Sequence, residues 1–404
     1  MASQSAVRLW RAAFLVVFGM VSCSPGDAGP PLVVQRDSAG IEIVEAMRPL
    51  WGDSSLWSID PEPVLDLTLS GSSPAHEFFR VGTVMRRPDG SIAVIDRNSQ
   101  EVRVFTGSGE HLGSFGGPGQ GPGEFSNLQR IKHAGDTLLA LDYDGRVTVV
   151  ASDLAVLRTL NLPHSTTDLY YLGAGAILTE SYSPAAWEDV ANELVRPPEA
   201  LMLFDLNGVR IDSIGETRGS ESYVYRDEEQ WADAASLFAR RSHIAVLGRR
   251  IFRGSSDLMQ VDELGMTGTV VRVLRIPDYP LALTDAQVAA ERDAHLDVEL
   301  PPGMTLPPFI RRINAALPSP VARPAYAEML VDPSAAVWLE LYRGRSEQDR
   351  PQEWLILDAD GTWLGTVEVP DRFRVTDITV DAVLGVWRDE MDVEHPQVLR
   401  LTRN

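Results

Sequence analysis

The stretch Glu101-Val-Arg-Val-Phe-Thr-Gly-Ser-Gly-Glu-His-Leu-Gly-Ser-Phe115 contains two short β-prone runs joined by a glycine turn. The pattern returns in Leu201-Met-Leu-Phe-Asp-Leu-Asn-Gly-Val-Arg-Ile-Asp-Ser-Ile214 and in Glu353-Trp-Leu-Ile-Leu-Asp-Ala-Asp-Gly-Thr-Trp-Leu-Gly-Thr-Val367. Short strands with regular turn signals indicate an all-β sandwich, barrel or propeller. Because a four-strand unit recurs at roughly 40 residues or more, the sequence predicts a β-propeller of four-stranded antiparallel blades. The expected blade-core residues are Val102, Val104, Phe105, Leu201, Leu203, Phe204, Trp354, Ile356 and Trp363.

The repeats divide the chain into six expected units. Their first strands should begin near Val81, Gln129, Leu169, His243, Ala327 and Val375. The last unit has room for only three strands, at Val375–Val380, Val383–Trp387 and Val398–Leu401. We therefore expect Pro63–Leu69 to supply its fourth strand, which would close the ring and protect two sheet edges. Ile41–Val44 is expected to add a further edge strand.

Composition limits the possible partners. The 404 residues carry a formal net charge of −21, and Lys132 is the only lysine among 36 basic residues. Nucleic-acid binding needs a basic face, so this acidic balance argues against a nucleic-acid partner. It also argues against broad adhesion to anionic membrane surfaces.

The N-terminus has the features of an export signal. Two arginines precede an apolar run at Ala12–Met20, which is too short to span a bilayer of about 20 helical residues. Met20-Val-Ser-Cys23 then resembles a bacterial lipobox, and Cys23 is the only cysteine in the chain. The expected organisation is a signal peptide at 1–22, a lipidated Cys23 with a tether to residue 32, and a propeller from 33 to 404. Simple secretion or an uncleaved anchor remain alternatives, because Met20 and Ser22 depart from the usual lipobox pattern.

One segment resembles a known family. Phe115-Gly-Gly-Pro-Gly-Gln-Gly-Pro-Gly-Glu-Phe125, which follows a Val-Phe strand, resembles the inter-blade segment of NHL-type propellers. The span from about Val33 to Arg403 is similar to bacterial six-bladed propeller lipoproteins related to them. The resemblance implies the fold and an exported location. Within the periplasm or cell envelope we expect the outer membrane, because Ser24 follows Cys23 in place of the aspartate that favours inner-membrane retention. It implies no reaction, because propellers host many functions.

The long connections should all lie at one end of the propeller. They are the segments 183–200, 215–241, 277–325 and 343–352. All are second-to-third-strand turns or links between blades, which share an end in an up-and-down blade. Helices are expected after the capping box Thr284-Asp-Ala-Gln287 and within Glu228–Phe238, and an extended loop within Pro301–Pro324. The insertions should expose Trp187, Trp231 and Phe309, types that are enriched in binding hot spots.

Most catalytic and metal-binding motifs are missing. The only lysine does not follow glycine, so there is no P-loop, and neither GxSxG nor HExxH occurs. Asp142-Tyr-Asp-Gly145 and Asp358-Ala-Asp-Gly361 are similar to calcium loops but lack the glutamate at position twelve, and both fit β-turns better. The sequence predicts no cofactor.

Polar residues gather at the starts of the expected innermost strands. They are Arg80, Arg130, Asp168, Tyr170, Glu328 and Asp377, with Arg240, Arg241 and Arg374 nearby. In a propeller these residues should surround the mouth of the central channel on the face with the insertions. They could bind a polar ligand, or form a self-satisfied ring of salt bridges around water.

Two functions remain open from the sequence. The first is an envelope binding or scaffold protein that presents its elaborated face to a protein or glycan partner. The second is a propeller hydrolase, lactonase or lyase with a metal at the channel mouth. That second function would need converging carboxylates, for which Asp168, Glu328 and Asp377 are the candidates.

Overall fold

The computed structural model describes residues 31–404, with gaps at 53, 183–189, 229, 298–299 and 301–302. The chain divides into two compact units, Met1–Pro31 and Leu32–Asn404, and the second is described below. The expected signal peptide and Cys23 lie outside the described residues. No helix in the described part is long and apolar enough to cross a membrane.

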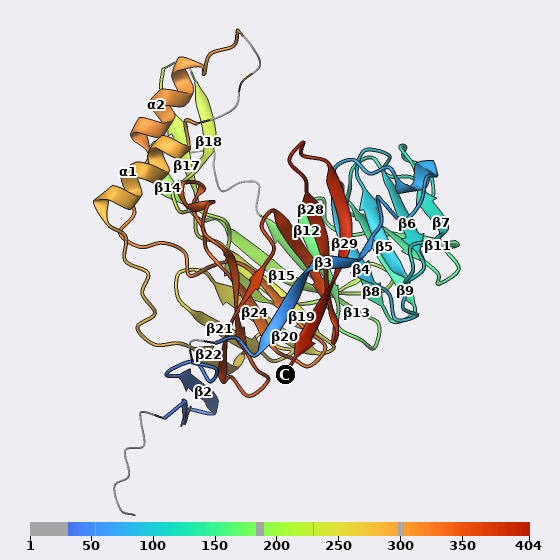
Figure 1. The fold of residues 1–404 in the computed structure, drawn as a ribbon, viewed down its shortest axis with the longest axis horizontal. Helices are drawn as coiled ribbons and strands as arrows, with labels where there is room; N and C mark the ends of the chain where they lie inside the picture. The colour runs from blue at the N-terminus through green and yellow to red at the C-terminus, as the bar shows by residue number, and fades with distance from the viewer. Residues whose placement is uncertain (1–30, 53, 183–189, 229, 298–299, 301–302) are drawn as a thin grey trace, which may run out of the picture. The chain divides into compact units, whose positions relative to one another are not determined.

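The second unit is built mainly from four-stranded antiparallel sheets (Figure 1). The first sheet contains β4 (Val81–Arg86), β5 (Ile92–Asp96), β6 (Glu101–Phe105) and β7 (His111–Gly116). The second contains β8 (Leu128–Ala134), β9 (Thr137–Asp142), β10 (Arg146–Val150) and β11 (Val156–Asn161). The third contains β12 (Thr166–Tyr171), β13 (Ala176–Tyr182), β15 (Pro198–Asp205) and β16 (Arg210–Arg218).

The remaining sheets of this kind follow in chain order. The fourth sheet contains β19 (Ser242–Leu247), β20 (Arg250–Ser255), β21 (Gln260–Leu264) and β22 (Val270–Arg275). The fifth contains β23 (Tyr326–Val331), β24 (Val337–Leu341), β25 (Gln352–Leu357) and β26 (Trp363–Val369). The sixth contains β27 (Phe373–Ile378), β28 (Ala382–Arg388), β29 (Glu394–Arg403) and β3 (Trp57–Asp66).

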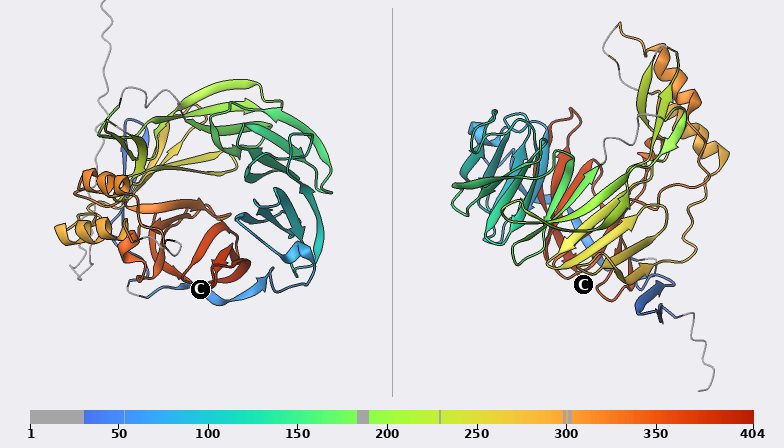
Figure 2. Two further views of the ribbon diagram at one scale, coloured as in Figure 1. Left: turned by 90° about the horizontal axis from the view of Figure 1, so that it is seen from above. Right: turned by 180° about the vertical axis from the view of Figure 1, so that it is seen from behind.

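The sheets follow one another around a common centre (Figure 2). The first strand of each sheet is the innermost, and each inner strand contacts the inner strand of the next sheet. The order β4, β8, β12, β19, β23, β27 then returns to β4. This closed cycle is the architecture of a β-propeller, as the repeats predict.

The sixth sheet is completed by β3, which comes from the start of the unit. Val398 pairs with Leu65, Leu399 with Pro63, and Leu401 with Ile59 in an antiparallel register. The predicted closure is therefore confirmed, although the strand extends from Trp57 to Asp66 rather than from residue 63 to 69.

A hairpin extends the fourth sheet. β1 (Val33–Ser38) pairs with β2 (Ile41–Ala46), and β2 runs parallel to β22. The edge strand expected at Ile41–Val44 is thus present. The strand β2 extends the edge of the fourth sheet, although in the sequence it comes just before β3 of the sixth sheet.

Apolar side chains pack between neighbouring sheets rather than in one central core. Val102, Val104 and Phe105 of β6 are fully buried, as are Leu201 of β15 and Ile356 of β25. The remaining predicted core residues, Leu203, Phe204 and Trp354, are also buried, and Trp363 is half-buried against a neighbouring cluster. At about 25 cal/mol per Å² of apolar area, these inter-sheet contacts supply the main stabilisation.

Segments from different insertions fold together into what we call the accessory module. It consists of a three-stranded sheet, β14 (Glu193–Val195), β17 (Ser222–Arg226) and β18 (Trp231–Ala235), and of α1 (Asp285–Ala294) and α2 (Pro308–Ala316). Their shared apolar cluster consists of Tyr223, Tyr225, Leu237, Phe238, Val288, Ile313 and Leu317. The sequence places each insertion separately, and it does not predict this common core.

One of the two expected helices is correct. Thr284 caps α1 with the reciprocal bonds of a capping box to Gln287. The helix expected within Glu228–Phe238 is wrong, because β18 pairs with β17 and half-buries alternate residues, Ala232 and Ala234. Pairing with a strand from the same insertion therefore outweighs the local helical spacing.

The extended loop expected over Pro301–Pro324 is also wrong in part. Its prolines lie towards the two ends of the segment and leave 309–317 free of them. Pro308 occupies the first turn of α2, where its missing N–H costs nothing. Ile313 and Leu317 are buried in the apolar cluster of the accessory module.

Candidate ligand-binding channel

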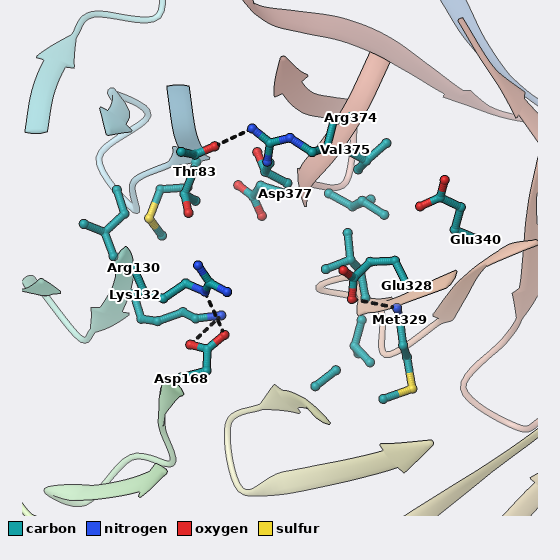
Figure 3. A pocket seen from close by; sticks show the side chains of 18 of the residues that line it. Thr83, Arg130, Lys132, Asp168, Glu328, Met329, Glu340, Arg374, Val375 and Asp377 are labelled. Carbon is teal, nitrogen blue, oxygen red and sulfur yellow. Dashed lines mark hydrogen bonds and ion pairs between the residues drawn. The ribbon is translucent and has the colours of Figure 1, made fainter. Parts of the chain in front are cut away.

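The inner strands surround a cavity of about 1120 Å³. Every inner strand contributes to its wall, and Figure 3 labels residues of β4, β8, β12, β23 and β27. Representative lining residues, one from each of β4, β8, β12, β19, β23 and β27, are Thr83, Arg130, Asp168, Ala245, Glu328 and Asp377. The site is the central channel that the propeller topology predicts.

Most of the predicted site residues line this cavity. Arg130, Asp168, Tyr170, Glu328 and Asp377 do so, together with the nearby Arg241 and Arg374. Two residues lie apart from the lining. Arg80 has an exposed side chain, and Arg240 pairs with Glu221 and Asp257 near the base of the accessory module.

Asp168 is the centre of a charged cluster on one wall. Its carboxylate lies 3.2 Å from Arg130 Nε and 3.7 Å from Lys132 Nζ (Figure 3). Lys132 Nζ also lies 4.5 Å from the ring centre of Tyr170, a favourable cation–π contact. The only lysine of the chain is therefore a channel residue, which its place in the sequence alone does not indicate.

Tyr170 turns its hydroxyl towards a buried acid behind the wall. It donates a hydrogen bond of 2.7 Å to Glu180 of β13. Burial, assisted by the charge of Asp168, raises the pKa of Glu180 to about 8. Burial also raises the pKa of Tyr170. Both groups are therefore mostly neutral at neutral pH and hold the wall in place.

Glu328 is held as an anion on the opposite wall. Its Oε1 lies 3.3 Å from His243 Nδ1 and accepts a 3.0 Å bond from the backbone N–H of Met329. Burial tends to raise its pKa, but these bonds and the charges of His243 and Arg241 lower it to about 2. Arg241 is fixed by two bonds to the carbonyl oxygen of Ala327.

Two further carboxyl groups in the channel hold their protons more tightly than usual. Burial raises the pKa of Asp377 to about 6, although its Oδ2 accepts a 2.8 Å bond from the N–H of Arg86. Burial and the charge of Glu328 raise the pKa of Glu340 to about 7. Gln352 donates a 3.0 Å bond to Glu340.

The carboxylates proposed for a metal do not come together. In the described part of the chain, no three His, Cys, Asp or Glu side chains form a group that could hold a metal ion. Asp168 is occupied by Arg130 and Lys132, Glu328 by His243, and Asp377 by backbone N–H groups. The two motifs similar to calcium loops are β-turns, closed by bonds from Gly145 N to Asp142 O and from Gly361 N to Asp358 O.

The sequence also misses Arg97, which lines the channel from the residue directly after β5. Arg97 Nη2 donates a 3.0 Å bond to the carbonyl oxygen of Gln129. Because it does not lie in an inner strand, the strand-start pattern could not identify it. Only the packing of the first sheet against the second brings it to the cavity.

No protein-family model matches the chain, and no curated protein matches its sequence. Solved structures do resemble it. A Bacteroides fragilis protein described as exported has a TM-score of 0.50 and 12% identity, with 87% of this chain and 96% of that one covered. The WD40 repeats of RRP9 have a TM-score of 0.46 and 10% identity, with 85% and 100% covered. A streptogramin B lyase has a TM-score of 0.39 and 9% identity, with 86% and 98% covered. At 12% identity, the likeness to the Bacteroides fragilis protein shows the fold alone.

Proposed function

We propose that this chain is an exported binding protein of the cell envelope, which presents its elaborated face to a protein or glycan partner. The observation that carries the proposal is the accessory module. Segments from separate connections in the third, fourth and fifth sheets share one apolar core at one end of the propeller. Loops grown independently would have no need of a common core, whereas a rigid recognition surface does.

The module is fastened firmly to the propeller. Glu291 of α1 is 1% exposed and accepts bonds from the N–H groups of Arg345 and Ser346, in the loop between β24 and β25. Arg323 and Glu347 form a two-bonded ion pair beside it. Such fixed geometry lowers the entropy that is lost when a partner binds.

The surface of the module includes an aromatic side chain suited to recognition. Trp231 of β18 is 52% exposed, and tryptophan is enriched among residues that dominate binding energy. Phe309, expected to be exposed, is half-buried against the core of the module, and Trp187 lies outside the described residues. Trp231 is therefore the residue on which a test should focus.

Export and anchoring form part of the proposal. The apolar run at Ala12–Met20 and the lipobox-like Met20-Val-Ser-Cys23 support a lipidated Cys23. Ser24 after the cysteine, in place of the aspartate that favours inner-membrane retention, supports an outer-membrane position in a cell that has one. The similarity of Phe115–Phe125 to NHL-type propellers supports the same class of exported proteins.

The binding function can be tested by site-directed photo-crosslinking in the native cell. A photoreactive residue replaces Trp231, and a control replaces Val209, which is 61% exposed at the turn between β15 and β16, at the opposite end of the sheets. We expect one discrete crosslinked product from position 231 and none from position 209. Equal crosslinking at both positions, or none at 231, would contradict a partner on the elaborated face.

A further inference from the structure

Two arginines from neighbouring sheets meet at one backbone carbonyl in the channel. Arg97 Nη2 and Arg130 Nη1 donate to the same oxygen, that of Gln129, at 3.0 and 3.1 Å. Arg97 follows β5 of the first sheet, and Arg130 belongs to β8 of the second. A shared acceptor places the two guanidinium groups side by side, although like charges repel.

A third arginine reaches the same place from the sixth sheet. Arg374 Nη2 donates to the carbonyl oxygens of Val81 and Gly82, at 2.8 and 2.9 Å. A Cβ at Gly82 would lie 3.3 Å from Arg97 Nε and 3.0 Å from Ile95, so glycine leaves room for Arg97 there. Figure 3 shows Arg374 and Arg130 facing the same cavity.

These cations have few anions to balance them. In the part of the chain that the structure describes, no ion pair joins Arg97 or Arg374 to a carboxylate, and the Nε of Arg97 is buried without a hydrogen-bond partner. Arg130 shares its carboxylate partner, Asp168, with Lys132. Burial and the charges of neighbouring arginines lower the pKa of both Arg97 and Arg374.

Glu394 and Glu328, the carboxylates whose charges act on Arg374, already have partners. Glu394 accepts bonds from the N–H of Val81 and from Arg388 Nη2, at 2.5 and 2.7 Å. Glu328 is bound by His243. Mutually satisfied ion pairs therefore describe Asp168, Arg130 and Lys132, but they do not include Arg97 or Arg374 among the described residues.

Bound anions remove the repulsion that such a group carries. A guanidinium presents paired N–H donors that match two oxygens of a carboxylate, sulfate or phosphate. In a channel walled by protein, the low-dielectric walls also focus the positive field on an entering anion. The chain as a whole is strongly acidic, with a net charge of −21, whereas these arginines place positive charge together in the channel.

We propose that the channel binds an oxyanion through Arg97, Arg130 and Arg374. This anion site lies in the channel rather than at Trp231, so the proposal goes beyond the proposed partner binding. The oxyanion is either a free inorganic ion or the acidic group of a sugar. A cavity of about 1120 Å³ is larger than one inorganic ion and has the size of a small-molecule site.

The experiment is calorimetric titration of the mature chain at constant ionic strength, maintained with sodium chloride. The probes are sodium sulfate, sodium phosphate, trigalacturonate and the neutral sugar maltotriose. We expect at least one of the oxyanions to bind and maltotriose not to bind. Sulfate or phosphate binding alone identifies a free-ion site, and trigalacturonate binding alone identifies a sugar acid.

Variants locate the site. Arg97→Met and Arg374→Met should each weaken oxyanion binding about tenfold or more, since each removes a charge-assisted donor pair. Arg97→Lys keeps the charge and loses the planar guanidinium, so it should lower the affinity for the oxyanion less than Arg97→Met does. It also serves as a control in case the methionine variant misfolds. Arg250→Met is the matched control, because Arg250 pairs with Glu263 on the fourth sheet outside the cavity lining.

Lys132 offers a second readout. As the only lysine of the chain, it is the one side chain that an amine-directed reagent can label, and it lines the channel. Bound oxyanion should slow its labelling, as followed by peptide mass spectrometry. The proposal is overturned if no oxyanion binds the wild-type chain, or if Arg97→Met and Arg250→Met bind equally well. Either result would leave crosslinking at Trp231 unaffected, so the two proposals can fail separately.

Discussion

Arg403, near the end of the last strand, holds the ring closed by binding a buried carboxylate of the neighbouring sheet. Its Nη2 lies 2.7 Å from Asp332 Oδ2 and donates a 3.1 Å bond to the carbonyl oxygen of Thr379. Its guanidinium also lies 4.4 Å from the ring centre of Trp57 in β3. Asp332 is fully buried in the turn between β23 and β24. One side chain therefore joins the sixth sheet, the fifth sheet and the closing strand.

Arg403→Met should lower the free energy of unfolding by about 3 kcal/mol. Removing one partner of a buried ion pair costs roughly 3–5 kcal/mol, because the remaining charge is left without compensation. The lower end applies here, because Asp332 keeps bonds from the N–H groups of Ser334 and Ala336 and from Trp338 Nε1. The arginine side chain is also 18% exposed.

The measurement is urea unfolding followed by tryptophan fluorescence, with Arg400→Met as the control. Arg400 lies exposed on the same strand, and surface changes of this kind cost within about 0.5 kcal/mol. Asp332→Asn in the Arg403→Met background should recover part of the loss, because it removes the uncompensated charge. If Arg403→Met unfolds at the same urea concentration as Arg400→Met, the ion pair with Asp332 does not stabilise the ring.

Four further predictions follow from the fold, the leader and the channel. Deleting residues 24–70 removes β3 and should give an aggregating product in size-exclusion chromatography; a monomer that melts like the full chain would disprove ring closure as a requirement. Cys23→Ser should move the protein from the membrane to the soluble fraction, and unchanged membrane binding would require another anchor. Millimolar Ca²⁺, Mg²⁺, Mn²⁺ or Zn²⁺ should leave the melting temperature nearly unchanged. A metal at a hundredfold excess over Kd would raise the free energy of unfolding by about 2.7 kcal/mol. A rise of several degrees that Asp168→Ala or Asp377→Ala abolishes would therefore favour the metal-enzyme alternative. Asp377→Asn should stabilise the protein at pH 7.5 and not at pH 4. The folded-state pKa of about 6 lies above the ordinary 3.8, so ionising Asp377 lowers the free energy of unfolding by at most about 3 kcal/mol above pH 6, and this cost disappears as the pH falls below 4. An Asn variant that is less stable at pH 7.5 would show that the ionised form is needed.

Local sequence patterns are enough to predict the propeller and the way it closes. Each strand is a short apolar run bounded by turn residues, and this information is local, so the repeats can be read without knowing the fold. Closure could also be predicted, because a last unit with three strand-forming runs needs a fourth strand and Pro63–Leu69 lies free just before the first unit. The strand-start pattern likewise brings Arg130, Asp168, Tyr170, Glu328 and Asp377 to the channel.

Contacts between segments that are remote in the chain could not be predicted from these patterns. The stretch around Trp231 becomes a strand because β17 pairs with it, and the insertions gain a common core only when they are folded. Arg97 reaches the channel, and Arg403 reaches Asp332, through packing between sheets that are far apart in the chain. Periodicity specifies which face of a strand is buried, but it carries no information about which remote side chain lies opposite. The balance of charge in the channel therefore emerges only in the assembled ring.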